Sequence, residues 1–151
     1  MGSRRDPAAA KVLIVEDEFL VALQLEDILT EAGHHVVGIV PDCAAVETID
    51  ETPQVALVDL NLRDGPSGPV IARMLAEKFG TVIIYVTANP AQIGRPAHTA
   101  IGVVQKPFSH HAILAAIAAA VNGATDGLPA DFEFIGGGME PARSRWASVQ
   151  L

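Results

Sequence analysis

The sequence predicts an α/β fold, in which a doubly wound, five-stranded parallel sheet has helices on both faces. Five short apolar runs rich in β-branched residues are separated by helix-length segments, the pattern of a parallel α/β sheet. The runs are continuously apolar, which is typical of strands buried on both faces. Right-handed crossovers between such strands produce a doubly wound sheet. The runs lie at residues 11–15, 36–40, 55–58, 81–86 and 101–104.

Helices are expected between these strands, because apolar residues recur there at helical spacing. Ser67 and Ser109 stand where N-cap residues would begin two of them, and Gly33 stands where a C-terminal glycine would end another. The segment 88–100 holds two prolines and a glycine, so we expect an irregular fourth helix. The other helices are expected over residues 19–32, 42–50 (a short one), 68–79 and 110–121.

The chain divides into a flexible N-terminal arm at residues 1–10, one domain at residues 11–122 and a C-terminal tail at residues 123–151. The arm is polar and Ala-rich, which is typical of a loose terminus. The tail contains a run of glycines and has no sustained periodicity. We therefore expect the tail to be disordered or to dock on a partner.

Composition excludes several classes of protein. Acidic residues outnumber basic ones 18 to 10, and the resulting net charge of −8 disfavours direct binding to nucleic acid. No apolar run approaches the ~20 residues of a membrane span, and no signal peptide is expected. The single cysteine, Cys43, excludes an internal disulfide and fits a reducing compartment. These features predict a cytoplasmic protein.

Polar residues follow the predicted strands at the sheet edge where ligands bind in doubly wound folds. Glu16 and Asp17 follow the first strand, Asp59 follows the third, and Thr87 and Lys106 follow the fourth and fifth. If the first and third strands are neighbours, the three carboxylates converge, and they raise one another's pKa unless a cation lies between them. An oxygen-rich site of this kind suits Mg²⁺.

The predicted cluster suits phosphoryl transfer. Mg²⁺ and Lys106 would offset the charge on the phosphoryl oxygens, and Thr87 would donate a hydrogen bond. Asp59 is then the nucleophile that forms an aspartyl phosphate. Taken singly, Asp59 could be a turn residue, Glu16 and Asp17 could favour a helix dipole, and Lys106 could be a surface lysine. Their combination favours the phosphoryl-transfer hypothesis.

Four short motifs stand at the ends of the predicted strands. They read Val-Leu-Ile-Val-Glu-Asp-Glu at 12–18, Ala-Leu-Val-Asp-Leu-Asn-Leu at 56–62, Val-Thr-Ala at 86–88 and Lys-Pro-Phe at 106–108. In this order they resemble the receiver domains of two-component response regulators. The resemblance covers residues 11–122 and implies a flavodoxin-like receiver fold with strand order 2-1-3-4-5.

The resemblance implies a metal site and a phosphoacceptor. Asp59 matches the phosphoacceptor, which is also a metal ligand. Asp17 matches a direct ligand of Mg²⁺, and Glu16 matches an acidic residue that acts through water. Asn61 matches the position whose backbone carbonyl completes the metal shell.

The resemblance also implies a switch, in which this sequence departs from the family. Thr87 matches the switch hydroxyl, and Lys106 matches the lysine that pairs with the phosphoryl group, with a bond to Pro107 that is typically cis. The family usually has an aromatic residue three positions before the lysine, and here that position is Val103. The irregular segment 88–100 is the second departure, and an order–disorder switch there could replace the side-chain switch.

We predict a stand-alone, single-domain response regulator that accepts a phosphoryl group on Asp59. The donor is a sensor histidine kinase or a histidine phosphotransfer protein, and Mg²⁺ is the cofactor. The protein is not expected to be an enzyme, beyond promoting its own phosphoryl transfer and dephosphorylation. Output is expected through contact with an unidentified downstream protein, and the regulator itself is expected to be a monomer or a weak dimer.

Two other hypotheses remain. The departures at Val103 and at residues 88–100 motivate a binding module with the receiver fold that is indifferent to phosphorylation. An enzyme on the same architecture is the third hypothesis. A phosphatase with an aspartate nucleophile usually has a second acid where Asn61 stands, and a flavin carrier has a Ser/Thr-rich loop where this chain is acidic.

Overall fold

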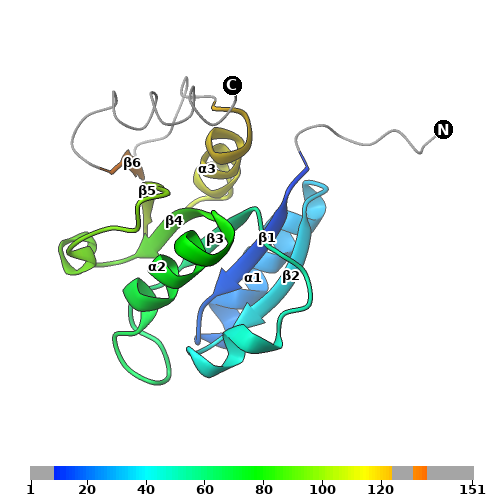
Figure 1. The fold of residues 1–151 in the computed structure, drawn as a ribbon. Coiled ribbons are helices and arrows are strands. Elements are labelled where there is room, and N and C mark those ends of the chain that lie inside the picture. Colours follow the sequence, from blue (N-terminus) through cyan, green and yellow to red (C-terminus); the bar gives the residue numbers. More distant parts are fainter. Residues whose placement is uncertain (1–8, 124–130, 136–151) are drawn as a thin grey trace.

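The sheet has six strands in the computed structural model, which describes residues 9–123 and 131–135 (Figure 1). The strands are β1 (Lys11–Val15), β2 (His35–Val40), β3 (Val55–Val58), β4 (Val82–Thr87), β5 (Ala100–Gln105) and β6 (Phe132–Phe134). Their order across the sheet is β2-β1-β3-β4-β5-β6. The first five strands are parallel, which confirms the predicted five-stranded arrangement, and β6 pairs antiparallel with β5.

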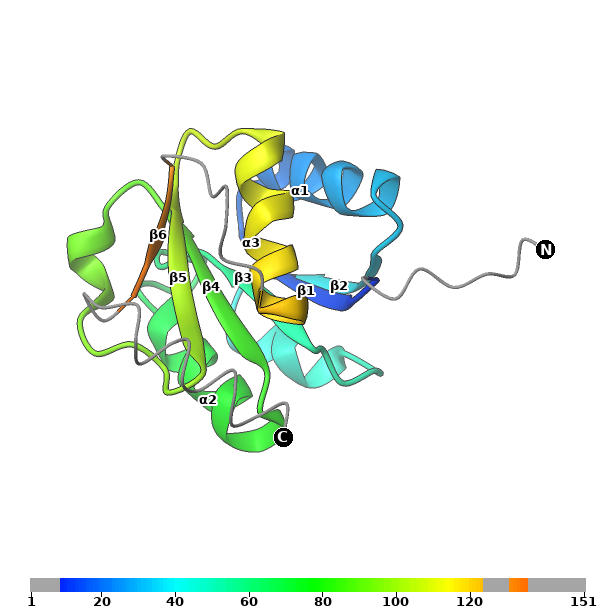
Figure 2. The same ribbon diagram turned by 90° about the horizontal axis from the view of Figure 1, so that it is seen from above.

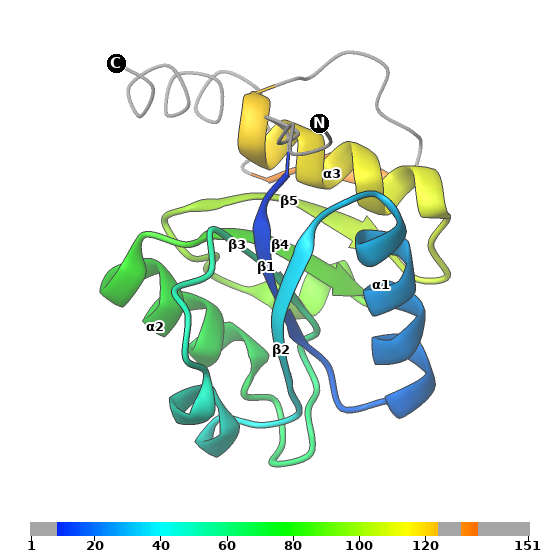
Figure 3. The same cartoon turned by 90° about the vertical axis from the view of Figure 1, so that its right-hand side faces the viewer.

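Helices cover both faces of the sheet, as predicted (Figures 2 and 3). One face packs against α1 (Phe19–Glu31) and α3 (His110–Asn122), and the other against α2 (Gly68–Phe79). Two short 3₁₀ helices, η1 (Ala44–Thr48) and η2 (Pro90–Ile93), also contribute to the α2 face. The short η2 confirms the prediction of an irregular fourth helix. The predicted helix at 42–50 is reduced to the 3₁₀ helix η1.

The two predicted serine caps have different outcomes. Ser109 accepts a hydrogen bond from the N–H of Ala112 at 3.0 Å, so its prediction as the N-cap of α3 is confirmed. Ser67 stands at the start of α2, but its hydroxyl donates to the carboxylate of Asp64 instead. The predicted side-chain cap is therefore wrong, because a nearby carboxylate acceptor orients the hydroxyl away from the helix.

The alternation of side chains along β1 shows why the strands read as continuous apolar runs. Val12 and Ile14 pack into the core under α1 and α3, whereas Leu13 and Val15 pack into the core under α2. Burial on both faces leaves no solvent side for polar residues. Polar residues are consequently confined to the strand ends, where the site lies.

The strand β6 lies within residues 123–151, the segment predicted to be a tail that is disordered or docks on a partner. Residues 132–134 extend the sheet at its β5 edge. A Cβ on Gly102 of β5 would lie 2.5 Å from the ring of Phe132. The ring thus occupies space that only a glycine leaves open. The rest of the predicted tail (124–130 and 136–151) and residues 1–8 of the predicted arm lie outside the described residues.

Candidate functional site

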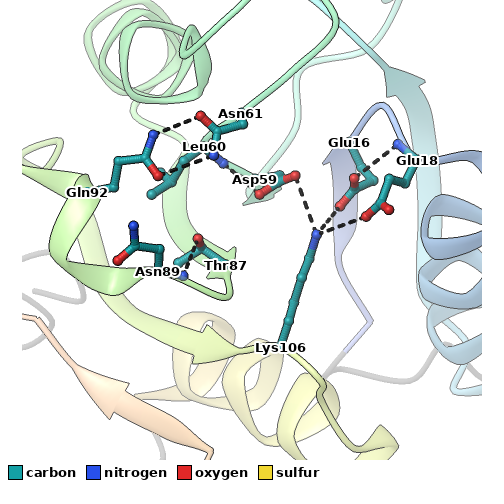
Figure 4. Close-up of polar contacts among 9 residues, drawn as sticks. All are labelled: Glu16, Glu18, Asp59, Leu60, Asn61, Thr87, Asn89, Gln92 and Lys106. Carbon is teal, nitrogen blue, oxygen red and sulfur yellow. Dashed lines mark hydrogen bonds and ion pairs between the residues drawn. The ribbon is translucent and has the colours of Figure 1, made fainter.

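The candidate site lies at the carboxyl ends of β1, β3, β4 and β5 (Figure 4). Parallel pairing in register aligns these ends: Val15 at the end of β1 lies opposite Val58 at the end of β3. The backbone N–H of Asp59 donates to the carbonyl of Val15 at 2.9 Å, and the N–H of Glu16 donates to the carbonyl of Val40 at 3.0 Å. The predicted site residues Glu16 and Asp59 are therefore fixed by the backbone of neighbouring strands.

Three carboxylates converge at this edge. One oxygen from each of Glu16, Asp17 and Asp59 lies within 4.8 Å of the others. Glu16 and Asp59 are buried, and Asp17 is exposed. Two buried acids and one exposed acid in such proximity would repel one another unless a cation lay among them. All three are hard oxygen donors, so the donor set fits Mg²⁺.

Lys106 joins the carboxylates from the end of β5. Its Nζ lies 3.1 Å from Oε1 of Glu16, 3.4 Å from Oδ2 of Asp59 and 3.6 Å from Oε1 of Glu18. The contact with Glu18 was not assigned to the site from the sequence, although Glu18 follows the acidic pair directly. The peptide bond between Lys106 and Pro107 is cis, as the resemblance implied.

The surroundings of Glu16 and Lys106 shift the pKa values of both side chains. Burial raises the pKa of Glu16 to about 7, and the charge of Asp59 adds to this effect. The N–H of Glu18 and the ammonium of Lys106 act in the opposite direction but do not outweigh burial. Burial would lower the pKa of Lys106, yet the carboxylates of Glu16 and Asp59 raise it above its ordinary value. The lysine therefore stays charged beside Asp59 at neutral pH.

Thr87 and Asn61 lie beside Asp59 but face the η2 segment (Figure 4). The Oγ1 of the buried Thr87 accepts a hydrogen bond from the N–H of Asn89 at 3.0 Å. The side-chain amide of Asn61 pairs with that of Gln92 in η2, through contacts of 2.7 and 3.2 Å. Gln92 was missed at the sequence level, because a single glutamine in an irregular segment gives no signal.

Position 103, where the family usually has an aromatic residue, holds a valine. Val103 is buried on β5 next to Tyr85 of β4, with which it is paired in register. The hydroxyl of the fully buried Tyr85 accepts a hydrogen bond from the N–H of Ala97 at 3.0 Å. Tyr85 is thus anchored to the segment that follows η2.

The arrangement has the parts that phosphoryl transfer requires. Asp59 presents a carboxylate oxygen, Lys106 supplies a fixed positive charge within ion-pair distance of it, and the acidic pair supplies further metal-binding oxygens. The N–H of Leu60 donates to Oδ1 of Asp59 at 2.8 Å, which fixes the orientation of the carboxylate. Oδ2 of Asp59 is then the oxygen that faces Lys106.

The sequence matches the response regulator receiver domain over residues 12–118. The chain belongs to this family. A curated relative, the phyllosphere-induced regulator PhyR of Methylorubrum extorquens, is 30% identical over 118 residues, which are 75% of this chain and 44% of the relative. The chain therefore spans less than half the length of that regulator.

The fold resembles the solved structures of two PhyR proteins. The solution structure of the PhyR receiver domain of Erythrobacter litoralis has a TM-score of 0.68 and 32% identity, covering 78% of this chain and 95% of that one. The crystal structure of the anti-anti-sigma factor PhyR of Bartonella quintana has a TM-score of 0.59 and 30% identity, covering 75% of this chain and 46% of that one. Among residues 9–123 and 131–135 of this receiver, no helix is long and apolar enough to cross a membrane.

Proposed function

We propose that this receiver accepts a phosphoryl group on Asp59 in a Mg²⁺-dependent reaction and passes the signal on by protein–protein contact. The observation that carries the proposal is the convergence of Glu16, Asp17 and Asp59 within 4.8 Å, with the Lys106 ammonium 3.4 Å from Asp59. The phosphodonor is a histidine kinase or a histidine phosphotransfer protein, and the protein works in the cytoplasm.

The transfer is a displacement at phosphorus. Oδ2 of Asp59 attacks the phosphorus atom, the bond between phosphorus and the donor's histidine nitrogen breaks, and the electron pair stays on that nitrogen. Lys106 compensates charge on the phosphoryl oxygens, and the hydroxyl of Thr87 donates a hydrogen bond to one of them. Glu16, Asp17, Asp59 and the backbone carbonyl of Asn61 would hold Mg²⁺, which supplies further charge compensation.

The test is intact-mass analysis after incubation with acetyl phosphate, with Mg²⁺ or with EDTA. We expect wild type to gain one phosphoryl group with Mg²⁺, whereas EDTA and Asp59→Asn should each abolish the gain. Asp27→Asn is the matched control, because Asp27 is an exposed aspartate on α1, outside the carboxylate cluster. Equal phosphorylation of wild type and Asp59→Asn would contradict the assignment of the phosphoacceptor.

Output through protein contact also agrees with the description of one relative. The PhyR of Bartonella quintana is described as an anti-anti-sigma factor, but the match covers 46% of that chain. For the present chain we therefore propose a receiver that recognises another protein, without assigning it that relative's role. It is not an enzyme with an external substrate, although it promotes its own phosphorylation and dephosphorylation.

A second candidate function is a binding module that does not respond to phosphorylation. The observation that favours it is Val103, which stands where the family usually has the aromatic side chain of the switch. This function predicts that backbone amide resonances of η2 are the same in the free and phosphorylated protein. A phosphorylation-dependent change in those resonances would exclude it.

A further inference from the structure

The crossover between β4 and β5 contains only the four-residue 3₁₀ helix η2, and the phosphorylation site contacts η2 directly. Gln92 Nε2 donates to Asn61 Oδ1 at 2.7 Å, and Asn61 Nδ2 donates to Gln92 Oε1 at 3.2 Å (Figure 4). The two amides thus satisfy each other reciprocally. Asn61 is two residues from Asp59, so this pair links η2 to the strand end that bears the phosphoacceptor.

A second contact joins the site to the start of the same segment. The Oγ1 of Thr87 accepts the N–H of Asn89 at 3.0 Å, and the carbonyl of Asn89 accepts the N–H of Gln92 at 3.0 Å. Asn89 is therefore hydrogen-bonded both to the hydroxyl of Thr87 and to Gln92, the residue that pairs with Asn61. A movement of Thr87 toward a phosphoryl group would withdraw the acceptor from Asn89.

The two ends of the crossover are held in different ways. Asn89 and Gln92 are exposed, whereas Ile93 and Ala97 are buried in the core, where the N–H of Ala97 bonds to the Tyr85 hydroxyl. Gly94, whose φ of +66° is a conformation that L side chains rarely adopt, lies between the two buried residues Ile93 and Ala97. The exposed near end, residues 89–92, can therefore change its position while Ile93 and Ala97 stay packed.

We infer that Gln92 is a positioning residue that couples the phosphorylation state of Asp59 to the conformation of η2. In the unphosphorylated protein, Asn61 and Thr87 hold the near end of the segment. Phosphorylation shifts both of these partners and releases residues 89–92. The coupling uses side chains at the site itself, so it does not require an aromatic residue at Val103. This inference rests on the proposed phosphorylation of Asp59.

The strength of the coupling follows from the exposure of the pair. An exposed hydrogen bond contributes little net free energy, so the two reciprocal bonds together correspond to roughly a fivefold change in an opening equilibrium. That change is large enough to bias a segment held by few contacts, and small enough to be reversed by events at Asp59.

The experiment is amide hydrogen exchange of the full chain followed by NMR, with Mg²⁺ and with or without excess acetyl phosphate. Wild type, Gln92→Ala and the control Gln24→Ala, an exposed glutamine on α1, are compared. Intact-mass analysis verifies that each sample treated with acetyl phosphate carries one phosphoryl group and that each untreated sample carries none. The reporting amides are those of Asn89 and Gln92, and the amide of Ala97 is the internal reference.

In wild type and Gln24→Ala, phosphorylation should speed exchange at the reporting amides by roughly fivefold and leave Ala97 unchanged. In Gln92→Ala, exchange should be fast before phosphorylation, and phosphorylation should change it less than twofold. A merely structural role for Gln92 would accelerate exchange equally in both states and leave the phosphorylation response intact, which would overturn the inference. If wild type accepts no phosphoryl group, the proposed function fails and the inference fails with it.

Discussion

Glu16 should make the stability of the metal-free receiver depend on pH in an unusual direction. Burial raises its pKa from 4.5 to about 7 in the folded protein, so the folded chain binds a proton that the unfolded chain has already lost. The free energy of unfolding therefore falls as the pH rises from about 4.5 to about 7 and levels off above that range. A carboxylate whose partners lower its pKa behaves in the opposite way, because its contribution to stability is lost as the pH falls.

The size of this effect follows from the two pKa values. They differ by about 2.5 pH units, and at about 1.4 kcal/mol per unit the upper limit is roughly 3 kcal/mol. Water entry and relaxation around the site reduce the effective penalty of burial, so we expect a loss of about 2 kcal/mol between pH 4.5 and 8. Mg²⁺ favours the carboxylate form, so adding it should remove most of the loss.

The assay is urea unfolding at several pH values, in EDTA and in Mg²⁺, for wild type, Glu16→Gln and the control Glu31→Gln. Glu31 is an exposed glutamate at the end of α1. The difference in unfolding free energy between wild type and Glu16→Gln should change by about 2 kcal/mol across this pH range in EDTA. If the free energy of unfolding depended on pH in the same way in wild type and in Glu16→Gln, the reasoning would be refuted, because groups other than Glu16 would then cause the pH dependence.

Three further substitutions test a close contact beside Asp59, the edge between β5 and β6, and a buried hydrogen bond of Tyr85. Gly68→Ala would place a Cβ 2.0 Å from the carbonyl oxygen of Asp59, so we expect a loss of about 3 kcal/mol in urea unfolding and slower phosphorylation of the fraction that folds. Gly102→Ala would place a Cβ 2.5 Å from the ring of Phe132, and exchange of the β6 amides should rise while the five parallel strands keep their protection. Tyr85→Phe removes the acceptor for a buried N–H, so thermal and urea unfolding should show a loss of about 1 to 3 kcal/mol, and an unchanged stability would contradict the anchoring role of that hydroxyl.

The parallel sheet could be predicted from the sequence because its strands are buried on both faces. Each strand is then a continuous apolar run, and the first polar residue after it marks the strand end. Since parallel strand ends meet at one edge, Glu16, Asp17, Asp59 and Lys106 could be placed together without any knowledge of side-chain positions. Their separation in sequence does not matter once the strand order is known.

Features that depend on one local contact could not be predicted in this way. β6 has three residues, too few for a periodic pattern, and it depends on the space that Gly102 leaves for the ring of Phe132. Ser67 and Ser109 have the same sequence signal for a cap, but Asp64 accepts the hydroxyl of Ser67. Gln92 becomes significant only because the chain after β4 is short enough to bring it against Asn61.

The resemblance to the family accounts for the carboxylate and lysine cluster, but it does not account for the surface between η2 and β6. The carboxylates and Lys106 form a connected cluster at the positions that the family motifs indicate. On the other side of η2, β6 extends the sheet beside Val103, and a hollow of about 350 Å³ lies between η2 and β6, lined in part by Val103 and Phe134. A change in the near end of η2 would reshape this hollow directly, because Pro90 forms part of its other wall. Release of the near end of η2 would therefore alter the surface beside β5 without the movement of an aromatic side chain. In a constitutive binding module this surface would not respond to phosphorylation, so substitutions at Gln92 distinguish the proposed coupling from such a module.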